Sequence, residues 1–197
     1  MSERMTVEPA TAGRLTAEET ARYVATEAVW APSVHNTQPW RLVADGQQIS
    51  LYADADRELP VADPDGREMM ISCGAALFNA RLALRSLGYI PETRVLPDPG
   101  QPTLVAQVSW RQHAPVCEFE RRLSSQVHLR RTHRGAFTPK PLPPGMLTAL
   151  RGSAVRDGAM LRIVADDGRR AALAAAVATA EHELRLEGER VRELARW

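Results

Sequence analysis

The sequence predicts an α+β fold in which a mainly antiparallel sheet packs against long helices. Residues 67–87 show helical periodicity, with apolar or small residues every three or four positions. Two short apolar-rich segments, 41–45 and 49–53, flank a Gly-Gln-Gln turn, which is typical of a β-hairpin. The chain has 197 residues, of which 44% are hydrophobic and 25% charged, so it is long enough to bury a core and has the composition of a globular protein.

Local signals set the predicted boundaries in the first half of the chain. Thr16-Ala-Glu-Glu19 is a capping box, and it predicts a helix that ends before Pro32. Asp63-Pro-Asp-Gly66 predicts the start of the long second helix, because it combines an acidic cap with an early proline. Gly88 predicts the end of that helix. Residues 104–110 are predicted to form a further strand.

The second half of the chain has weaker signals. We expect short helices over 115–127 and 146–155, a strand over 161–165 and a proline-rich loop over 134–145. From Arg169 to the end, apolar residues recur at spacings of three, four and seven, which predicts one long helix. This helix is expected to pack on its own domain in preference to forming a coiled coil.

An internal match indicates a duplication. Arg41-Leu-Val-Ala-Asp45 recurs as Arg162-Ile-Val-Ala-Asp166, at an offset of 162 − 41 = 121 residues. A helix, a loop and a strand are predicted twice in the same order. We therefore expect an N-terminal tail over 1–14, a first repeat over 15–127 and a partial second repeat over 128–197.

Charge and cysteine usage exclude several classes of protein. Lys and Arg number 25 and Asp and Glu number 24, so a net charge of +1 argues against nucleic acid or an anionic membrane as a partner. Cys73 and Cys117 lie in no CxxC pair, and the N-terminus has no apolar targeting segment. No apolar stretch is long enough to span a bilayer. These observations predict a cytoplasmic protein.

Most familiar catalytic motifs do not occur. The sequence has no phosphate-binding Walker loop and no dinucleotide glycine fingerprint. Ser33 is in no nucleophile elbow, His182-Glu183 lacks the second histidine of a zinc protease, and the five histidines do not cluster, so no metal site is predicted. We expect Cys73 to be a buried apolar side chain and not a redox thiol.

A polar loop at residues 31–40 carries the most informative pattern. Asn36 and Gln38 each offer an amide donor and a carbonyl acceptor, which can read the edge of a flat heterocycle. The alternative is that both amides only satisfy the local backbone. His35 has two interpretations, an exposed loop residue or a pocket group. Trp40 is expected to pack in the core behind the loop.

A second polar segment, Arg130-Arg-Thr-His-Arg134, concentrates three guanidinium groups and a hydroxyl in five residues. Arginine forks match phosphate oxygens in bidentate geometry. The alternative is a solvated basic turn beside Arg121 and Arg122.

These residues resemble a known family. Ala-Pro-Ser-Val-His-Asn-Thr-Gln-Pro-Trp, residues 31–40, is similar to the flavin-contacting loop of the nitroreductase family, whose pattern is A-P-S-x-x-N-x-Q-P-W. Within that family the chain looks like the Acg-like branch, in which two repeats are fused, and the similarity runs from about Leu15 through LPVADPDGRE and SCGAALFNARLALRSLGY. The resemblance implies the FMN-dependent nitroreductase fold, with an incomplete second repeat.

The resemblance also implies the residues of an FMN site. In the loop, Ser33 and Asn36 are candidates for the flavin ring edge. In the second segment Thr132 takes the place of a family serine, Arg130 would hold the phosphate, Arg131 and Thr132 would touch the ribityl chain or the ring, and Arg134 would approach the ring. The complete set of implied cofactor contacts is Pro32, Ser33, Val34, Asn36, Gln38, Arg130, Arg131, Thr132 and Arg134.

The two motifs belong to different repeats. The first repeat has the loop without an arginine opening, and the second has the opening with a decayed loop over 153–160. Asp157 and Ala159 stand there in place of Asn36 and Gln38. The resemblance therefore implies one composite FMN site in each chain.

The implied function is hydride transfer from NAD(P)H through FMN to an electron-poor small molecule such as a nitroaromatic or a quinone, without a protein acid or base. Two alternatives stay open: a flavin-binding or sequestering protein without significant turnover, and a truncated inactive fragment. The incomplete second repeat would leave sheet edges uncovered, so we expect self-association as a homo-oligomer.

Overall fold

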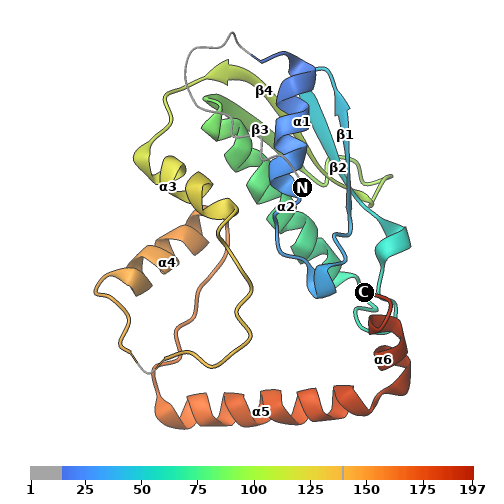
Figure 1. Ribbon diagram of the computed structural model, residues 1–197, viewed down its shortest axis with the longest axis vertical. Coiled ribbons are helices and arrows are strands. Elements are labelled where there is room, and N and C mark those ends of the chain that lie inside the picture. The colour runs from blue at the N-terminus through green and yellow to red at the C-terminus, as the bar shows by residue number, and fades with distance from the viewer. Residues whose placement is uncertain (1–14, 139) are drawn as a thin grey trace, which may run out of the picture. The chain divides into compact units, whose positions relative to one another are not determined.

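The structure is a computed structural model that describes residues 15–138 and 140–197 (Figure 1). The chain divides into two compact units, and the division falls between Arg131 and Thr132. This division does not test the predicted duplication, so the repeat boundary after residue 127 stays a prediction. The predicted tail over 1–14 lies outside the described residues.

The first unit contains a four-stranded antiparallel sheet with the order β1-β2-β4-β3. The strands are β1 (Trp40–Asp45), β2 (Gln48–Ala53), β3 (Tyr89–Val95) and β4 (Leu104–His113). The predicted hairpin and the predicted 104–110 strand are confirmed, and so is the α+β class. β3 was not predicted, because Pro91, Glu92 and Arg94 interrupt any apolar alternation along this edge strand.

Two helices, α1 (Ala17–Ala28) and α2 (Arg67–Ser86), cover one face of the sheet (Figure 1). The capping box of α1 is present, with the Glu19 amide 3.2 Å from the Thr16 hydroxyl. The Asp63 carboxylate accepts the amides of Glu68 and Met69 at 3.0 and 2.8 Å, so the acidic start signal of α2 is real although Gly66 is its N-cap. The helix ends where predicted, before Gly88 at a φ of 82°.

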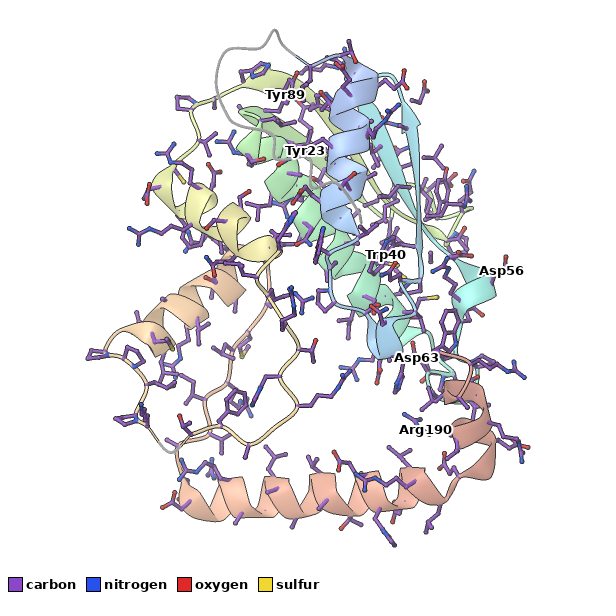
Figure 2. The ribbon with its side chains drawn as sticks, viewed as in Figure 1. Tyr23, Trp40, Asp56, Asp63, Tyr89 and Arg190 are labelled. Atoms are coloured by element: carbon purple, nitrogen blue, oxygen red, sulfur yellow. The ribbon has the colours of Figure 1, made fainter. Side chains whose placement is uncertain are left out.

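The core lies between these helices and the sheet. Its centre is Trp110 of β4, which is fully buried. Trp40 and Tyr89 are also buried, and they enter the core from different strands (Figure 2). A first cluster of buried side chains is formed by Ala21, Val24, Ala28, Ile49, Ala80, Ala83, Leu84, Tyr89, Val108 and Trp110. Both helices contribute buried side chains to this core.

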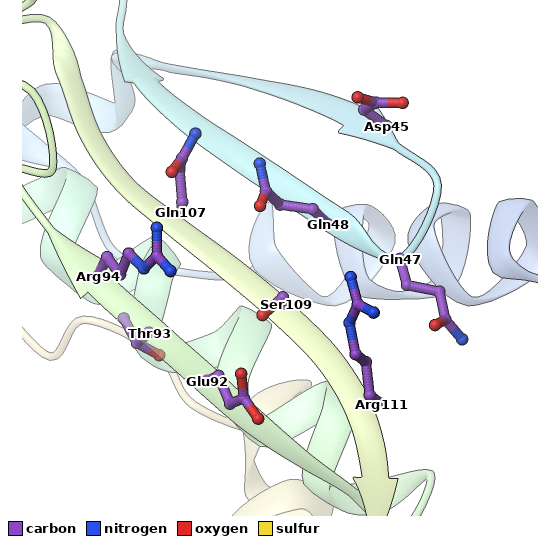
Figure 3. Close-up of a pocket in the computed structure, with 9 residues that line it drawn as sticks. All are labelled: Asp45, Gln47, Gln48, Glu92, Thr93, Arg94, Gln107, Ser109 and Arg111. Atoms are coloured by element: carbon purple, nitrogen blue, oxygen red, sulfur yellow. The ribbon is translucent and has the colours of Figure 1, made fainter.

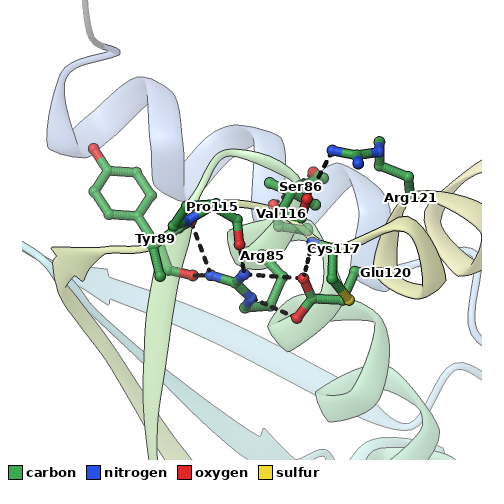
Figure 4. Close-up of polar contacts among 10 residues, drawn as sticks. Arg85, Ser86, Tyr89, Pro115, Val116, Cys117, Glu120 and Arg121 are labelled. Atoms are coloured by element: carbon green, nitrogen blue, oxygen red, sulfur yellow. Dashed lines mark hydrogen bonds and ion pairs between the residues drawn. The ribbon is translucent and has the colours of Figure 1, made fainter.

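A further helix, α3 (Glu118–Val127), is joined to α2 by an ion pair (Figure 4). The Arg85 guanidinium donates to both oxygens of Glu120, at 2.7 and 2.9 Å, and to the carbonyls of Tyr89 and Pro115 at 2.9 and 2.8 Å. The Arg85 side chain is 14% exposed and that of Glu120 is 24% exposed. The hydrogen bonds from Arg85 lower the pKa of Glu120 to about 2.

The second unit is helical. It contains α4 (Met146–Arg156), α5 (Asp167–Leu186) and α6 (Gly188–Leu194). The predicted strand over 161–165 is wrong: within the described part of this unit no strand lies beside the segment to pair with it. The predicted single C-terminal helix is also wrong, because Glu187, at a ψ of 95°, separates α5 from α6. Across the described ranges, none of the helices combines the length and apolar character that crossing a membrane requires.

We expect Glu120→Gln to reduce the free energy of unfolding by about 2 kcal/mol, because Arg85 would lose its charged partner in a shielded position. The folded pKa of Glu120, about 2, lies below its ordinary value of 4.5. The stabilisation is therefore complete above the ordinary value and is lost as the pH falls toward the folded one.

Urea denaturation from neutral to acid pH measures this contribution. The variant is expected to show a shallower acid dependence than the wild type. Glu118→Gln is the matched control, since this glutamate of the same helix forms only exposed pairs with Arg121 and Arg122. Identical acid dependence in the wild type and Glu120→Gln would contradict the assignment.

Candidate functional site

The loop between α1 and β1 has an unusual backbone. It contains a short 3₁₀ helix, η1 (Val34–Asn36). His35, Asn36 and Gln38 have φ values of 46, 61 and 49°, in the left-handed region that residues other than glycine rarely adopt. Such conformations cost free energy and persist only where the surrounding structure imposes them. The loop is therefore held in one shape by its neighbours.

Hydroxyl groups provide part of this support. The Ser33 hydroxyl accepts the Gln38 amide at 3.0 Å, which closes the loop on itself. Ser72 of α2 accepts the Val34 amide at 3.2 Å and donates to the Glu68 carbonyl at 2.7 Å. The loop is thus tied to a buried position of the long helix.

The far end of the loop is fixed by two more groups. Arg57, at the end of η2 (Ala55–Arg57), donates to the Thr37 carbonyl at 2.9 Å and pairs with Asp54 at 3.2 Å. The Cys73 thiol donates to the Pro39 carbonyl at 3.2 Å. Cys73 is fully buried, and burial raises the pKa of its thiol to about 11. This confirms that Cys73 is a buried apolar side chain, and Trp40 packs behind the loop as predicted.

The same loop presents polar groups to solvent. His35 and Asn36 are exposed and Gln38 is half-buried. Within the described ranges, no hydrogen bond engages the side-chain amides of Asn36 and Gln38, so the local backbone does not use them. Each amide retains a donor and an acceptor for a ligand. Pro32 is also exposed, and Ser33 and Val34 are half-buried.

The chain after α3 lies against the start of this loop. Arg130 donates from Nη2 to the Trp30 carbonyl at 3.2 Å. The guanidinium carbon of Arg131 lies 5.9 Å from the Trp30 ring centroid, and its Nη1 donates to the carbonyls of His128 and Arg130 at 2.7 and 2.8 Å. The first unit therefore brings Arg130 and Arg131 to a residue only three positions before Ser33.

Thr132 and Arg134 lie in the second unit. Their predicted contacts with a cofactor stay predictions, and so does the composite site. Sequence reasoning missed Arg57 and Ser72, which support the loop, and Glu27 and His128, which contact each other beside Trp30. No pattern in the sequence marks these four as partners, since each contact joins positions far apart in the chain.

A polar hollow of about 630 Å³ lies on the sheet face away from α1 and α2 (Figure 3). Its lining residues are Asp45, Gln47, Gln48, Glu92, Thr93, Arg94, Gln107, Ser109 and Arg111. It contains none of the predicted site residues. In the described part of the chain, no three histidine, cysteine, aspartate or glutamate side chains come together as metal ligands.

Comparison with known proteins identifies relatives by sequence. A Mycobacterium tuberculosis (strain H37Rv) protein named "putative NAD(P)H nitroreductase" is 37% identical over 179 residues, which is 91% of this chain and 51% of the relative. Another from the same strain, "putative NAD(P)H nitroreductase acg", is 34% identical over 139 residues, 71% of this chain and 42% of the relative. The chain spans about half the length of these curated relatives. No protein-family model matches it.

Among solved structures, one that the comparison finds is a "putative nitroreductase in complex with FMN" from Desulfovibrio desulfuricans. It is 18% identical, with a TM-score of 0.40, over 71% of this chain and 91% of that one.

We expect Ser72→Ala to increase hydrogen exchange at the Val34 amide about fivefold, because a lost hydrogen bond worth about 1 kcal/mol raises the open population of the loop by that factor. Amide exchange followed by NMR or mass spectrometry measures it. Ser125→Ala is the control, since Ser125 donates only to the Arg122 carbonyl on the exposed side of α3. Unchanged exchange at Val34 would show that Ser72 does not hold the loop.

Proposed function

Because the chain belongs to the nitroreductase family, in its Acg-like branch, we propose that it binds FMN and acts as an NAD(P)H-dependent oxidoreductase on small electron-poor acceptors such as nitroaromatics and quinones. One observation carries the proposal. The Arg130 guanidinium donates a hydrogen bond to the carbonyl of Trp30, directly before the loop. In that loop the exposed side-chain amide of Asn36 forms no hydrogen bond with any other described residue.

The chemistry of these groups fits FMN. A guanidinium carries five N–H donors in a planar fork that matches phosphate oxygens. The Asn36 amide can pair with the alternating donors and acceptors on the edge of the flavin ring. Hydrogen bonds that involve Ser33, Ser72 and Arg57 hold the left-handed backbone of the loop, which reduces the ordering that binding requires. When bound, FMN supplies the hydride chemistry.

We assign the residues of this chain the following roles. Arg130 binds the phosphate. Ser33, Asn36 and Gln38 line the ring edge, and Pro32 and Val34 shape the backbone on either side of Ser33. Arg131 fixes its own segment through the carbonyls of His128 and Arg130, and it lies close enough to Trp30 to border the site. Thr132 and Arg134 are proposed as further cofactor contacts on the family resemblance alone.

We expect Arg130→Ala to weaken FMN binding at least tenfold, because a hydrogen bond to a charged phosphate is worth about 1.5–3 kcal/mol. Titration of the chain with FMN, followed by flavin fluorescence and the visible spectrum, measures the change. Arg122→Ala is the control, since among the described residues this arginine of the preceding helix pairs only with exposed Glu118. A wild-type chain that does not bind FMN would overturn the proposal.

A turnover assay distinguishes an enzyme from a protein that only sequesters flavin. The enzyme is expected to oxidise NADH or NADPH steadily when a nitroaromatic or quinone is added to the FMN-bound chain. Tight FMN binding without acceptor-dependent oxidation would leave binding as the function and contradict the proposed activity.

A further inference from the structure

Three side chains beside the proposed site make a further set of contacts with one another. We call this group the Trp30 cluster, and it consists of Glu27, Trp30 and His128. His128 Nε2 lies 2.8 and 2.9 Å from the two carboxylate oxygens of Glu27. The His128 ring also stacks on Trp30, with ring centroids 4.7 Å apart and planes at 18°. One imidazole therefore makes both a polar and a stacking contact with the segment that leads into the loop.

Glu27 is the fixed side of this cluster. Its side chain is 12% exposed, whereas that of His128 is 50% exposed. The Glu27 carbonyl accepts the side-chain amide of buried Asn79 on α2 at 3.2 Å. Since α2 also holds the loop through Ser72, the backbone of Glu27 and the loop are attached to the same helix.

His128 is the C-cap of α3, and its position determines where the next residues lie. The amides of Leu129 and Arg130 both donate to the Gln126 carbonyl, at 3.1 and 2.9 Å, so the chain turns tightly after the helix. Arg131 ties the same turn to the His128 carbonyl at 2.7 Å. His128 is only two residues before Arg130, which carries the proposed phosphate-binding guanidinium.

We propose that Glu27, Trp30 and His128 are positioning residues for the flavin phosphate: the cluster holds the turn after α3 so that Arg130 is already beside the loop before the ligand arrives. This inference rests on the proposed FMN binding. Holding a long side chain in place removes part of the entropy that binding would otherwise cost. The benefit applies only to a ligand with a phosphate for Arg130 to bind.

FMN and riboflavin therefore provide the test, since riboflavin has the same ring and lacks the phosphate. We expect His128→Ala and Glu27→Gln to weaken FMN binding about fivefold to tenfold and to leave riboflavin binding unchanged. His128→Gln keeps a donor for Glu27, and it is expected to recover part of the FMN affinity. The controls are His182→Ala and Glu18→Gln, which change exposed residues of the same types.

A measurement without flavin accompanies the titrations. Hydrogen exchange over 128–131 is expected to increase in His128→Ala while exchange in the core strand β4 stays unchanged, which shows that the variant is folded and that the turn alone has loosened.

Three other results would overturn the inference, and one of them would also reject the proposed function. Equal weakening of FMN and riboflavin would overturn the inference, because the cluster would then act on general stability. Unchanged affinities for both ligands would also overturn it, while leaving FMN binding intact. A wild-type chain that binds neither flavin would reject the proposed function and the inference together.

Discussion

The packing of α2 against the sheet is the constraint on which the first unit depends. Small side chains on its buried face, such as Cys73, Ala76 and Ala80, allow the helix to lie close to the strands. Three of the polar residues of this helix, Ser72, Asn79 and Arg85, are spaced seven and six positions apart, which is close to two turns each. Each one holds a different segment of the chain.

Ser72 holds the loop, Asn79 holds the end of α1 at Glu27, and Arg85 holds the start of α3 at Glu120. Two of the three are buried and the third is largely shielded, so water competes little for their hydrogen bonds. The proposed site follows from this arrangement. The amide-bearing loop is attached directly to this helix, through Ser72 and Cys73. The arginine-bearing turn is attached to it indirectly, because His128 contacts Glu27 and Glu27 accepts a hydrogen bond from Asn79.

The shape of the loop gives this support a functional meaning. Three consecutive or near-consecutive left-handed residues are unfavourable in isolation, and the hydrogen bonds from Ser33, Ser72 and Arg57 offset that cost. This conformational free-energy cost is offset during folding, so a ligand binds a surface that is already formed and that exposes amide groups. Both proposed contributions to FMN binding, the loop and the positioned Arg130, are forms of this preorganisation.

Sequence reasoning could predict the features that depend on local pattern. The long helix α2 follows from its apolar period and its Asp63 and Gly88 signals, and the hairpin follows from two short strands around a turn. Edge strand β3 could not be predicted, since one side of it faces solvent and Pro91 breaks the pattern. The segment 161–165 is similar in sequence to β1 but lacks a partner strand among the described residues. Strand propensity alone does not form the hydrogen bonds between strands.

The proposed site also contains residues that the sequence predicts and residues that it does not. The loop residues and Arg130 are predicted from two motifs that resemble those of a known family. Their supports were not found, because Glu27 and His128 are 101 positions apart and Val34 and Ser72 are 38 apart. Such pairs are created by the tertiary structure, and no spacing rule for a single helix or strand reveals them.

We infer that the first unit presents a preformed loop and a positioned Arg130 to one ligand. A crystal structure of the chain grown with FMN tests it most directly. We expect the phosphate within hydrogen-bonding distance of the Arg130 guanidinium, the ring edge at Asn36, and left-handed backbone still present at His35, Asn36 and Gln38. A phosphate bound away from Arg130, or a loop rebuilt around the flavin, would contradict it.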